Sequence, residues 1–213
     1  MSPVGSGSKV LAGTRLSVAP TPIAAEDEAD GRRRRSLDSR ARIVAALLEL
    51  IHSGDLAPSA EAVALRAGVG LRTVFRHFKD MESLYGEMAQ AIEAELRTVV
   101  DAPFQSEPGL ERLLELVQRR SAVFEKITPY KRASDIHRHQ SAFLAASHAR
   151  LVTLARDILR RELPADLVRD QLKFEALDML LSYEVWSRLR RDQGLTARRA
   201  RETLEAAVRA VIG

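Results

Sequence analysis

The spacing of apolar residues constrains the fold of this chain more than any other feature. From Asp38 to the C-terminus apolar residues recur every three to four positions, the period of an amphipathic α-helix. No stretch shows the alternating pattern of a β-strand. The chain has 213 residues, 46% of them hydrophobic, which suffices for one or two domains with a core. We therefore expect an all-α protein of about nine helices.

Caps, glycines and prolines place the ends of these helices. Ser59 and Thr196 are good N-cap residues, whereas Gly54, Gly68 and Gly194 favour chain breaks. We expect helices over residues 38–52, 58–67, 71–77, 81–100, 110–127, 140–163, 165–191 and 196–212, with a further short helix starting at Thr128.

Charge and composition divide the chain into three parts. Residues 1–31 are rich in Ser, Gly, Pro and Thr and lack periodicity, so we expect a disordered tail. Residues 32–80, the head, hold ten Lys/Arg against five Asp/Glu, whereas residues 81–213, the body, hold 21 against 20. The basic excess is thus confined to the head, as expected where phosphates are bound, although a solvated basic face would have the same composition.

Several function classes are disfavoured by the sequence. The absence of Cys excludes disulfides and thiolate metal sites, and no apolar run is long enough to span a membrane. The N-terminus lacks a secretion signal, so a cytoplasmic location is expected. His137 and His139 lie ~200° apart on a helix and do not share a face. No phosphate-binding loop, zinc-protease motif or nucleophile elbow occurs, so we expect no enzyme, metal or cofactor.

Two short helices joined by Ala67-Gly68-Val69 form a predicted helix-turn-helix. Gly68 provides the positive φ that a tight turn needs, while Val63 and Val69 fill the angle between the helices. The second helix then exposes Arg72 and Arg76, residue types that read guanine in the major groove when such a helix enters it. The alternative is a helical hairpin with solvated surface charges.

The stretch from Ser59 to Leu84 resembles the DNA-binding signature of the TetR (tetracycline-repressor) family of transcription regulators. The matching residues are Val63-Ala64, Ala67-Gly68-Val69, Thr73-Val74-Phe75-Arg76-His77-Phe78, Glu82 and Leu84, and the resemblance covers roughly residues 38–85. Three positions depart from the family's pattern, with Gly70 in place of the usual Ser, Phe75 in place of Tyr and Met81 in place of Lys. The last two changes remove a hydroxyl and a charge that would contact phosphate.

The resemblance implies that Arg72, Thr73 and Arg76 face the major groove and that His77 contacts a phosphate. Leu71 and Phe75 would meet a thymine methyl group or pack internally. The helical spacing by itself turns Val74 and Phe78 inward, so these two are expected in the core. An arginine run preceding the helix-turn-helix would compensate for the phosphate interactions that Phe75 and Met81 cannot make. The residues predicted to meet double-stranded operator DNA are Arg32, Arg33, Arg34, Arg35, Ser59, Leu71, Arg72, Thr73, Phe75, Arg76, His77 and Lys79.

The resemblance also implies that the body forms a homodimer through its last two helices and binds a small-molecule effector. Helix 165–191 is apolar on more than one face, which fits burial against both its own body and a twin. Aromatic and histidine side chains are candidates for the ligand site, although such residues are more often plain core or surface than ligand contacts. These candidates are Phe104, Phe124, Tyr130, His137, Phe143, His148 and Trp186.

The sequence therefore predicts a homodimeric transcription regulator, a repressor released from its operator by a small molecule. The alternative is a helical protein-interaction module whose head has lost its capacity to read DNA, which the changes at Phe75 and Met81 leave open.

Overall fold

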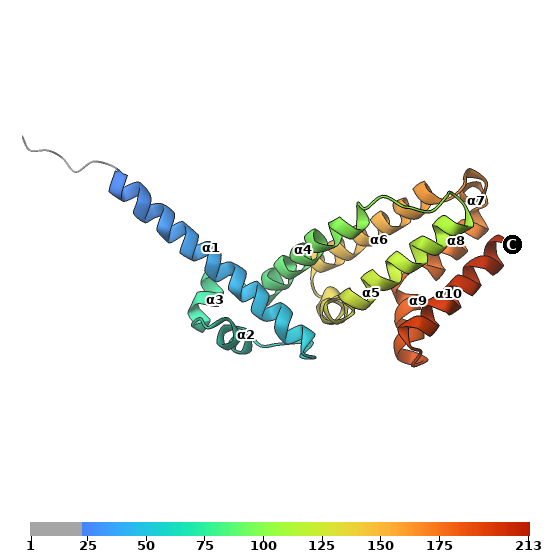
Figure 1. Ribbon diagram of the computed structural model, residues 1–213. Coiled ribbons are helices and arrows are strands. Elements are labelled where there is room, and N and C mark those ends of the chain that lie inside the picture. Colours follow the sequence, from blue (N-terminus) through green and yellow to red (C-terminus); the bar gives the residue numbers. More distant parts are fainter. Residues whose placement is uncertain (1–22) are drawn as a thin grey trace, which may run out of the picture. The chain divides into compact units, whose positions relative to one another are not determined.

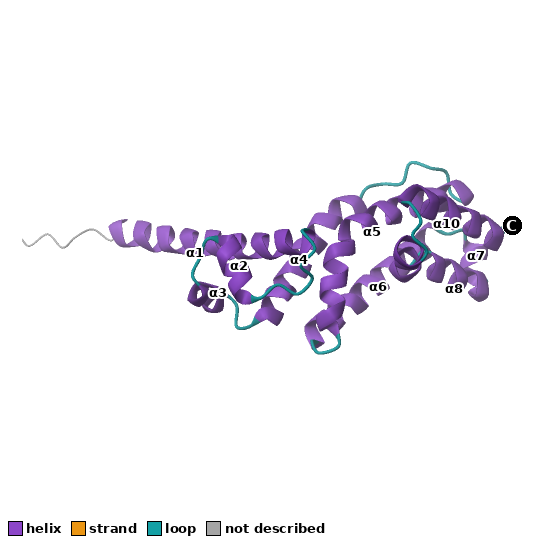
Figure 2. Cartoon of the chain, turned by 90° about the horizontal axis from the view of Figure 1, so that it is seen from below, coloured by secondary structure: helices purple, strands orange, loops and turns teal. Residues whose placement is uncertain are grey.

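The computed structural model describes residues 23–213, and every regular element in this part of the chain is a helix (Figures 1 and 2). The all-α prediction is thus confirmed, and residues 1–22 of the predicted tail lie outside the described residues. The chain divides into two compact units, residues 1–38 and residues 39–213. No helix of the described residues is long and apolar enough to cross a membrane.

The first four helices are α1 (Ile23–His52), α2 (Ala60–Ala67), α3 (Leu71–His77) and α4 (Met81–Val100). Helices α3 and α4 have the predicted bounds, and Ser59 is the N-cap of α2. Helix α1 begins at Ile23 and not near residue 38 as predicted. Residues 23–31, predicted as part of a disordered tail, are helical, and so are residues 32–37. This segment contains Ala and Glu, good helix formers, and an ion pair of 3.7 Å joins Asp30 to Arg34 one turn later.

The remaining elements are α5 (Leu110–Arg138), α6 (Ala142–Glu162), α7 (Ala165–Arg169), α8 (Gln171–Leu180), α9 (Tyr183–Ser187), the π-helical segment η1 (Arg188–Asp192) and α10 (Ala197–Ile212). The predicted break near residue 128 is wrong, because α5 runs on through Pro129. Thr128 precedes the proline, and its hydroxyl donates to the carbonyl of Phe124 at 2.6 Å. The helix continues although Pro129 has no N–H to donate to the carbonyl of Glu125.

The single helix predicted over 165–191 is also wrong, because the structure divides it into α7, α8, α9 and η1. The side chain of Asp170 accepts a hydrogen bond from the Lys173 N–H at 3.1 Å, and that of Ser182 accepts one from the Val185 N–H at 3.3 Å. Each of these caps begins a new helix where the apolar periodicity shows no interruption.

Two buried clusters form the cores of residues 39–213. The first is built from α1, α2, α3 and α4 and includes Ala133 of α5 and Leu144 of α6. The second lies among α5, α6, α7, α8, α9, η1 and α10, around Trp186 and Leu177. Helix α4 therefore shares a core with α2 and α3 and also packs against α5 and α6 (Figure 1). The division predicted between residues 80 and 81 remains a prediction.

Candidate nucleic-acid interface and body cavity

The turn between α2 and α3 has the geometry that the sequence predicts. Gly68 adopts a left-handed conformation, with φ of 63° and ψ of 39°. The N–H of Gly68 donates to the carbonyl of Leu65 at 3.2 Å, and that of Val69 donates to the carbonyl of Ala64 at 3.0 Å. At the other end of α2, the Ser59 hydroxyl accepts from the Ala62 N–H at 3.2 Å. Both ends of this short helix are thereby satisfied, which fixes where α3 begins.

Helix α3 has one buried face and one exposed face. Val74 is buried within α3 and Phe78 directly after it, as predicted for core residues, whereas Arg72 and Arg76 are exposed. Thr73 is half-buried. Two apolar side chains are exposed beside the arginines, Leu71 at 37% and Phe75 at 47%. The outer face of α3 thus presents two cations and two apolar side chains, all on one short, anchored helix.

Arg40 of α1, which the sequence analysis did not single out, holds the end of α3 in place. Its Nη1 donates to the carbonyl of His77 at 2.7 Å, while its Nη2 and Nε donate to the carboxylate of Glu87 at 2.6 and 3.3 Å. The guanidinium also lies 4.4 Å from the ring centroid of Phe78. One side chain therefore joins α1, α3 and α4. The sequence offers no signal for this role, because Arg40 is one of several arginines in a basic segment.

His77, a predicted phosphate contact, is half-buried, and its Nε2 has no hydrogen-bond partner among the described residues. Burial lowers the pKa of His77, and the nearby charges of Arg76 and Arg40 lower it further. In the free protein the imidazole is therefore neutral at pH 7.

The other predicted DNA contacts differ in their surroundings. Lys79 is exposed, and Met81, which replaces the usual lysine, is half-buried against the first core. Gly70 is the N-cap of α3, and because glycine has no side chain it makes no capping hydrogen bond. Arg33, Arg34 and Arg35 are exposed on α1 in the first unit, and the side chain of Arg32 lies outside the described residues.

A cavity of about 230 Å³ lies in the body, lined by residues of α4, α5, α6, α8 and α9 and by Phe104. Of the predicted ligand contacts, Phe104, Phe124 and His148 line it. Tyr130 lines a smaller cavity of about 70 Å³ that also touches His148. Burial lowers the pKa of His148, so its imidazole is neutral at pH 7.

Three predicted ligand contacts line neither of these cavities. Trp186 is buried in the second core, with its ring 6.4 Å from that of Phe124 and its Nε1 donating to Glu125 at 3.0 Å. The ring of His137 lies 4.4 Å from that of Tyr85 on α4. Phe143 packs against Gly86 of α4. Four of the seven candidates thus line a cavity and three do not, and a role in ligand binding remains a prediction for all of them.

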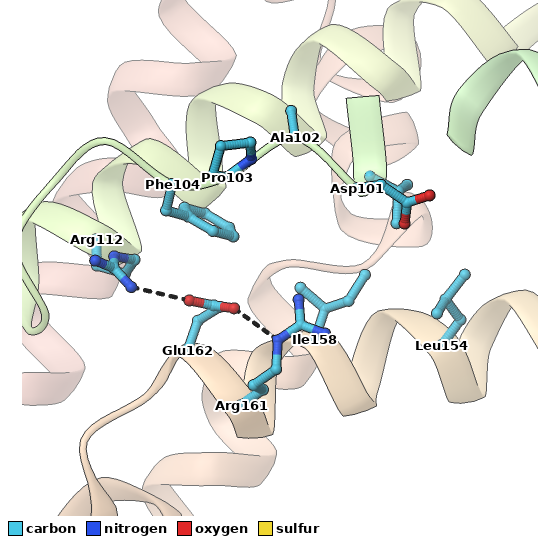
Figure 3. Close-up of a pocket in the computed structure, with 10 residues that line it drawn as sticks. Asp101, Ala102, Pro103, Phe104, Arg112, Leu154, Ile158, Arg161 and Glu162 are labelled. Atoms are coloured by element: carbon cyan, nitrogen blue, oxygen red, sulfur yellow. Dashed lines mark hydrogen bonds and ion pairs between the residues drawn. The ribbon is translucent and has the colours of Figure 1, made fainter. Parts of the chain in front are cut away.

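A surface groove of about 360 Å³ adjoins the cavity, and the two share Val100, Phe104, Leu154 and Ile158 as lining residues. Figure 3 shows Phe104 on the segment between α4 and α5, opposite the α6 residues Ile158 and Glu162. Glu162 accepts from Arg112 at 3.1 Å across the groove (Figure 3). The groove and the cavity are thus neighbouring spaces between the α4–α5 segment and α6.

In the described part of the chain, no three His, Asp or Glu side chains are placed so that they could hold a metal ion.

Comparison with known proteins gives a match at the level of the fold. No protein-family model matches the sequence, and no curated protein matches it either. Among solved structures, the chain is similar to one from Mesorhizobium loti described as a candidate TetR-family transcriptional regulator. The two share 20% identity with a TM-score of 0.58, over 84% of this chain and 96% of the other.

Proposed function

We propose that this chain, which has the fold of TetR-type regulators, is a DNA-binding transcription regulator: a homodimeric repressor that a small molecule releases from its operator. The observation that carries the proposal is the outer face of α3. Arg72 and Arg76 are exposed there, while Val74 and Phe78 anchor the same helix in the first core. A recognition helix requires this combination, because its base-reading side chains must be free while its backbone is held rigidly.

The chemistry of the exposed face suits the major groove. An arginine guanidinium donates two hydrogen bonds to guanine, and apolar groups such as Leu71 and Phe75 suit the methyl group of thymine. Phe75, which cannot donate a hydroxyl to phosphate, would then contribute a base contact instead. The basic head supplies the sequence-independent attraction to phosphates.

The test is fluorescence anisotropy with labelled DNA from immediately upstream of the protein's own gene, against random DNA of the same length, at two salt concentrations. We expect binding to the upstream DNA to exceed binding to random DNA at the higher salt. Arg72→Ala and Arg76→Ala should each weaken specific binding by ~1–3 kcal/mol, the worth of a base contact. Arg150→Ala, at an exposed arginine of α6, changes the net charge equally and serves as the matched control.

Weak binding to both DNAs that salt abolishes, here and with other promoters, would contradict the proposal. Unchanged affinity of Arg72→Ala and Arg76→Ala would contradict it as well. Either result would favour the protein-interaction module instead.

The arginine run in the first unit is proposed as a second contributor, through phosphates rather than bases. Replacing Arg32, Arg33, Arg34 and Arg35 by Gln in the same titrations should lower affinity for upstream and random DNA alike. The slope of log affinity against log salt should also become shallower, by about 0.9 for each phosphate that the run neutralises. An unchanged slope would show that the run stays clear of DNA.

Two features support release by a small molecule. The cavity in the body is partly lined by Leu96, Val99 and Val100 at the end of α4, and α4 also shares the first core with α3. A ligand that favours another position of α4 would therefore alter the placement of the recognition helix. Release requires that the ligand bind the DNA-incompetent state better than the competent one.

A further inference from the structure

Arg120 of α5 is an unusual lining residue for the largely apolar body cavity. Its guanidinium is partly buried and donates to two backbone carbonyls, those of Leu181 at 2.9 Å and of Ala155. Among the described residues no carboxylate lies within 4.0 Å of it. Burial lowers the pKa of Arg120 to about 10, so the group remains charged at neutral pH. The cavity therefore holds a poorly hydrated cation whose neighbours are neutral carbonyl groups.

The other cations that line the cavity have carboxylate partners. Arg119 donates to Glu115 at 2.5 Å, and the ammonium of Lys131 lies 2.6 Å from Asp135. Their charges are thus already compensated within the protein. Arg120 differs from both of them in this respect.

The acids that line the cavity do not compensate Arg120 directly. Asp178 accepts from Arg156 at 2.6 Å, and its charge acts on Arg120 only from beyond 4.0 Å. Glu184 is exposed, so water solvates its carboxylate. Removing a cation from water is costly unless an anion or several hydrogen bonds replace that water.

We propose that the effector is a small amphipathic carboxylate whose anionic group binds Arg120 and whose apolar part fills the cavity. This inference rests on the proposed role of the cavity as the effector site. A guanidinium binds a carboxylate through two parallel hydrogen bonds, and Arg120 uses one N–H on each terminal nitrogen for the carbonyls, which leaves donors for a ligand. Phe104, Phe124 and the aliphatic side chains of α4 and α6 would surround the apolar part.

The size of the cavity limits the apolar part. At about 30 Å³ per water-sized group, its volume of about 230 Å³ holds about eight such groups. Octanoate is therefore a suitable probe, with 1-octanol as an uncharged molecule of matched length.

The test measures binding of each probe to the full chain without DNA, by calorimetry and by the fluorescence of Trp186, the single tryptophan, which contacts the lining residue Phe124. We expect octanoate to bind about tenfold more tightly than 1-octanol. Arg120→Gln should reduce octanoate affinity by about tenfold or more and leave 1-octanol affinity unchanged, because this variant removes only the charge-assisted bond. Arg150→Gln, at the exposed arginine of α6 that does not line the cavity, removes the same charge and should retain octanoate binding.

Equal binding of octanoate and 1-octanol, or no octanoate binding, would overturn the proposal without any variant, so it stays testable even if Arg120→Gln fails to fold. Equal losses of affinity in Arg150→Gln and Arg120→Gln would overturn it too, because the effect would then reflect charge in general. None of these measurements involves DNA, whereas the anisotropy experiment involves no ligand. Failure of the carboxylate assignment is therefore distinguishable from failure of the proposed regulator function.

Discussion

Gly86, in the second turn of α4, contacts the ring of Phe143 on α6 so closely that a Cβ atom there would lie 2.9 Å from Phe143 Cε1. Gly86→Ala should therefore destabilise the protein by ~1 kcal/mol. Alanine gains up to about 1 kcal/mol in helix propensity, but overpacking costs about 1–3 kcal/mol. Urea unfolding of the variant and the parent measures the difference in the free energy of unfolding.

A Phe143→Ala background reverses the sign of this prediction. Without the ring, Gly86→Ala should stabilise α4 by up to about 1 kcal/mol, because only the propensity gain remains. Destabilisation of the same size in both backgrounds would show that the ring is not the cause.

At the scale of elements, α3 has only seven residues, too few for a helix to be stable alone. Its position depends on the burial of Val74 and Phe78 and on the bonds of Arg40 to the carbonyl of His77 and to Glu87. We predict that Arg40→Gln lowers the free energy of unfolding by about 1–3 kcal/mol, the cost of removing hydrogen bonds to a charged group. It should also weaken DNA binding, because Arg40 holds α3 in position.

Arg42→Gln, at an exposed arginine on the same helix, is the matched control and should leave stability within about 0.5 kcal/mol of the parent. In a double-mutant cycle, Glu87→Gln should cost less in the Arg40→Gln background than in the parent, because the two side chains share one interaction. Strictly additive effects of the two changes would show that Arg40 and Glu87 do not stabilise the protein through a shared interaction.

Elements that depend on local signals could be predicted from the sequence. The cap at Ser59 and the left-handed Gly68 define α2 and the start of α3 within a few residues, so the buried Val74 and Phe78 followed from spacing alone. Elements whose continuity depends on context could not be predicted. A proline inside a helix usually ends or kinks it, yet α5 continues through Pro129.

The same distinction holds for the candidate site. The exposed arginines on α3 follow from local periodicity. The hydrogen bond of Arg40 to Glu87 does not, because it joins residues that are 47 positions apart. The aromatic candidates for the ligand site divide between core and cavity positions for the same reason. Nothing local distinguishes Trp186, buried in the second core, from Phe124, which lines the cavity.

At the scale of the whole molecule, the proposed repressor must be a dimer, because two recognition helices about 34–36 Å apart are needed to read two half-sites. Helix α8 exposes two large apolar side chains seven positions apart on one face, Leu172 at 84% and Met179 at 60%. Such side chains on a surface helix favour a covered interface, here a second copy of the chain.

We therefore expect sedimentation equilibrium to give twice the 23.6 kDa of one chain. Leu172→Glu combined with Met179→Glu should shift the mass to that of the single chain, because burying two carboxylates in an apolar interface is costly. Leu65→Glu is the matched control, since Leu65 of α2 is also 84% exposed but lies outside the last helices. That variant should remain a dimer. A parent protein that sediments as a single chain would contradict the dimer, and equal dissociation of both variants would contradict its placement on α8.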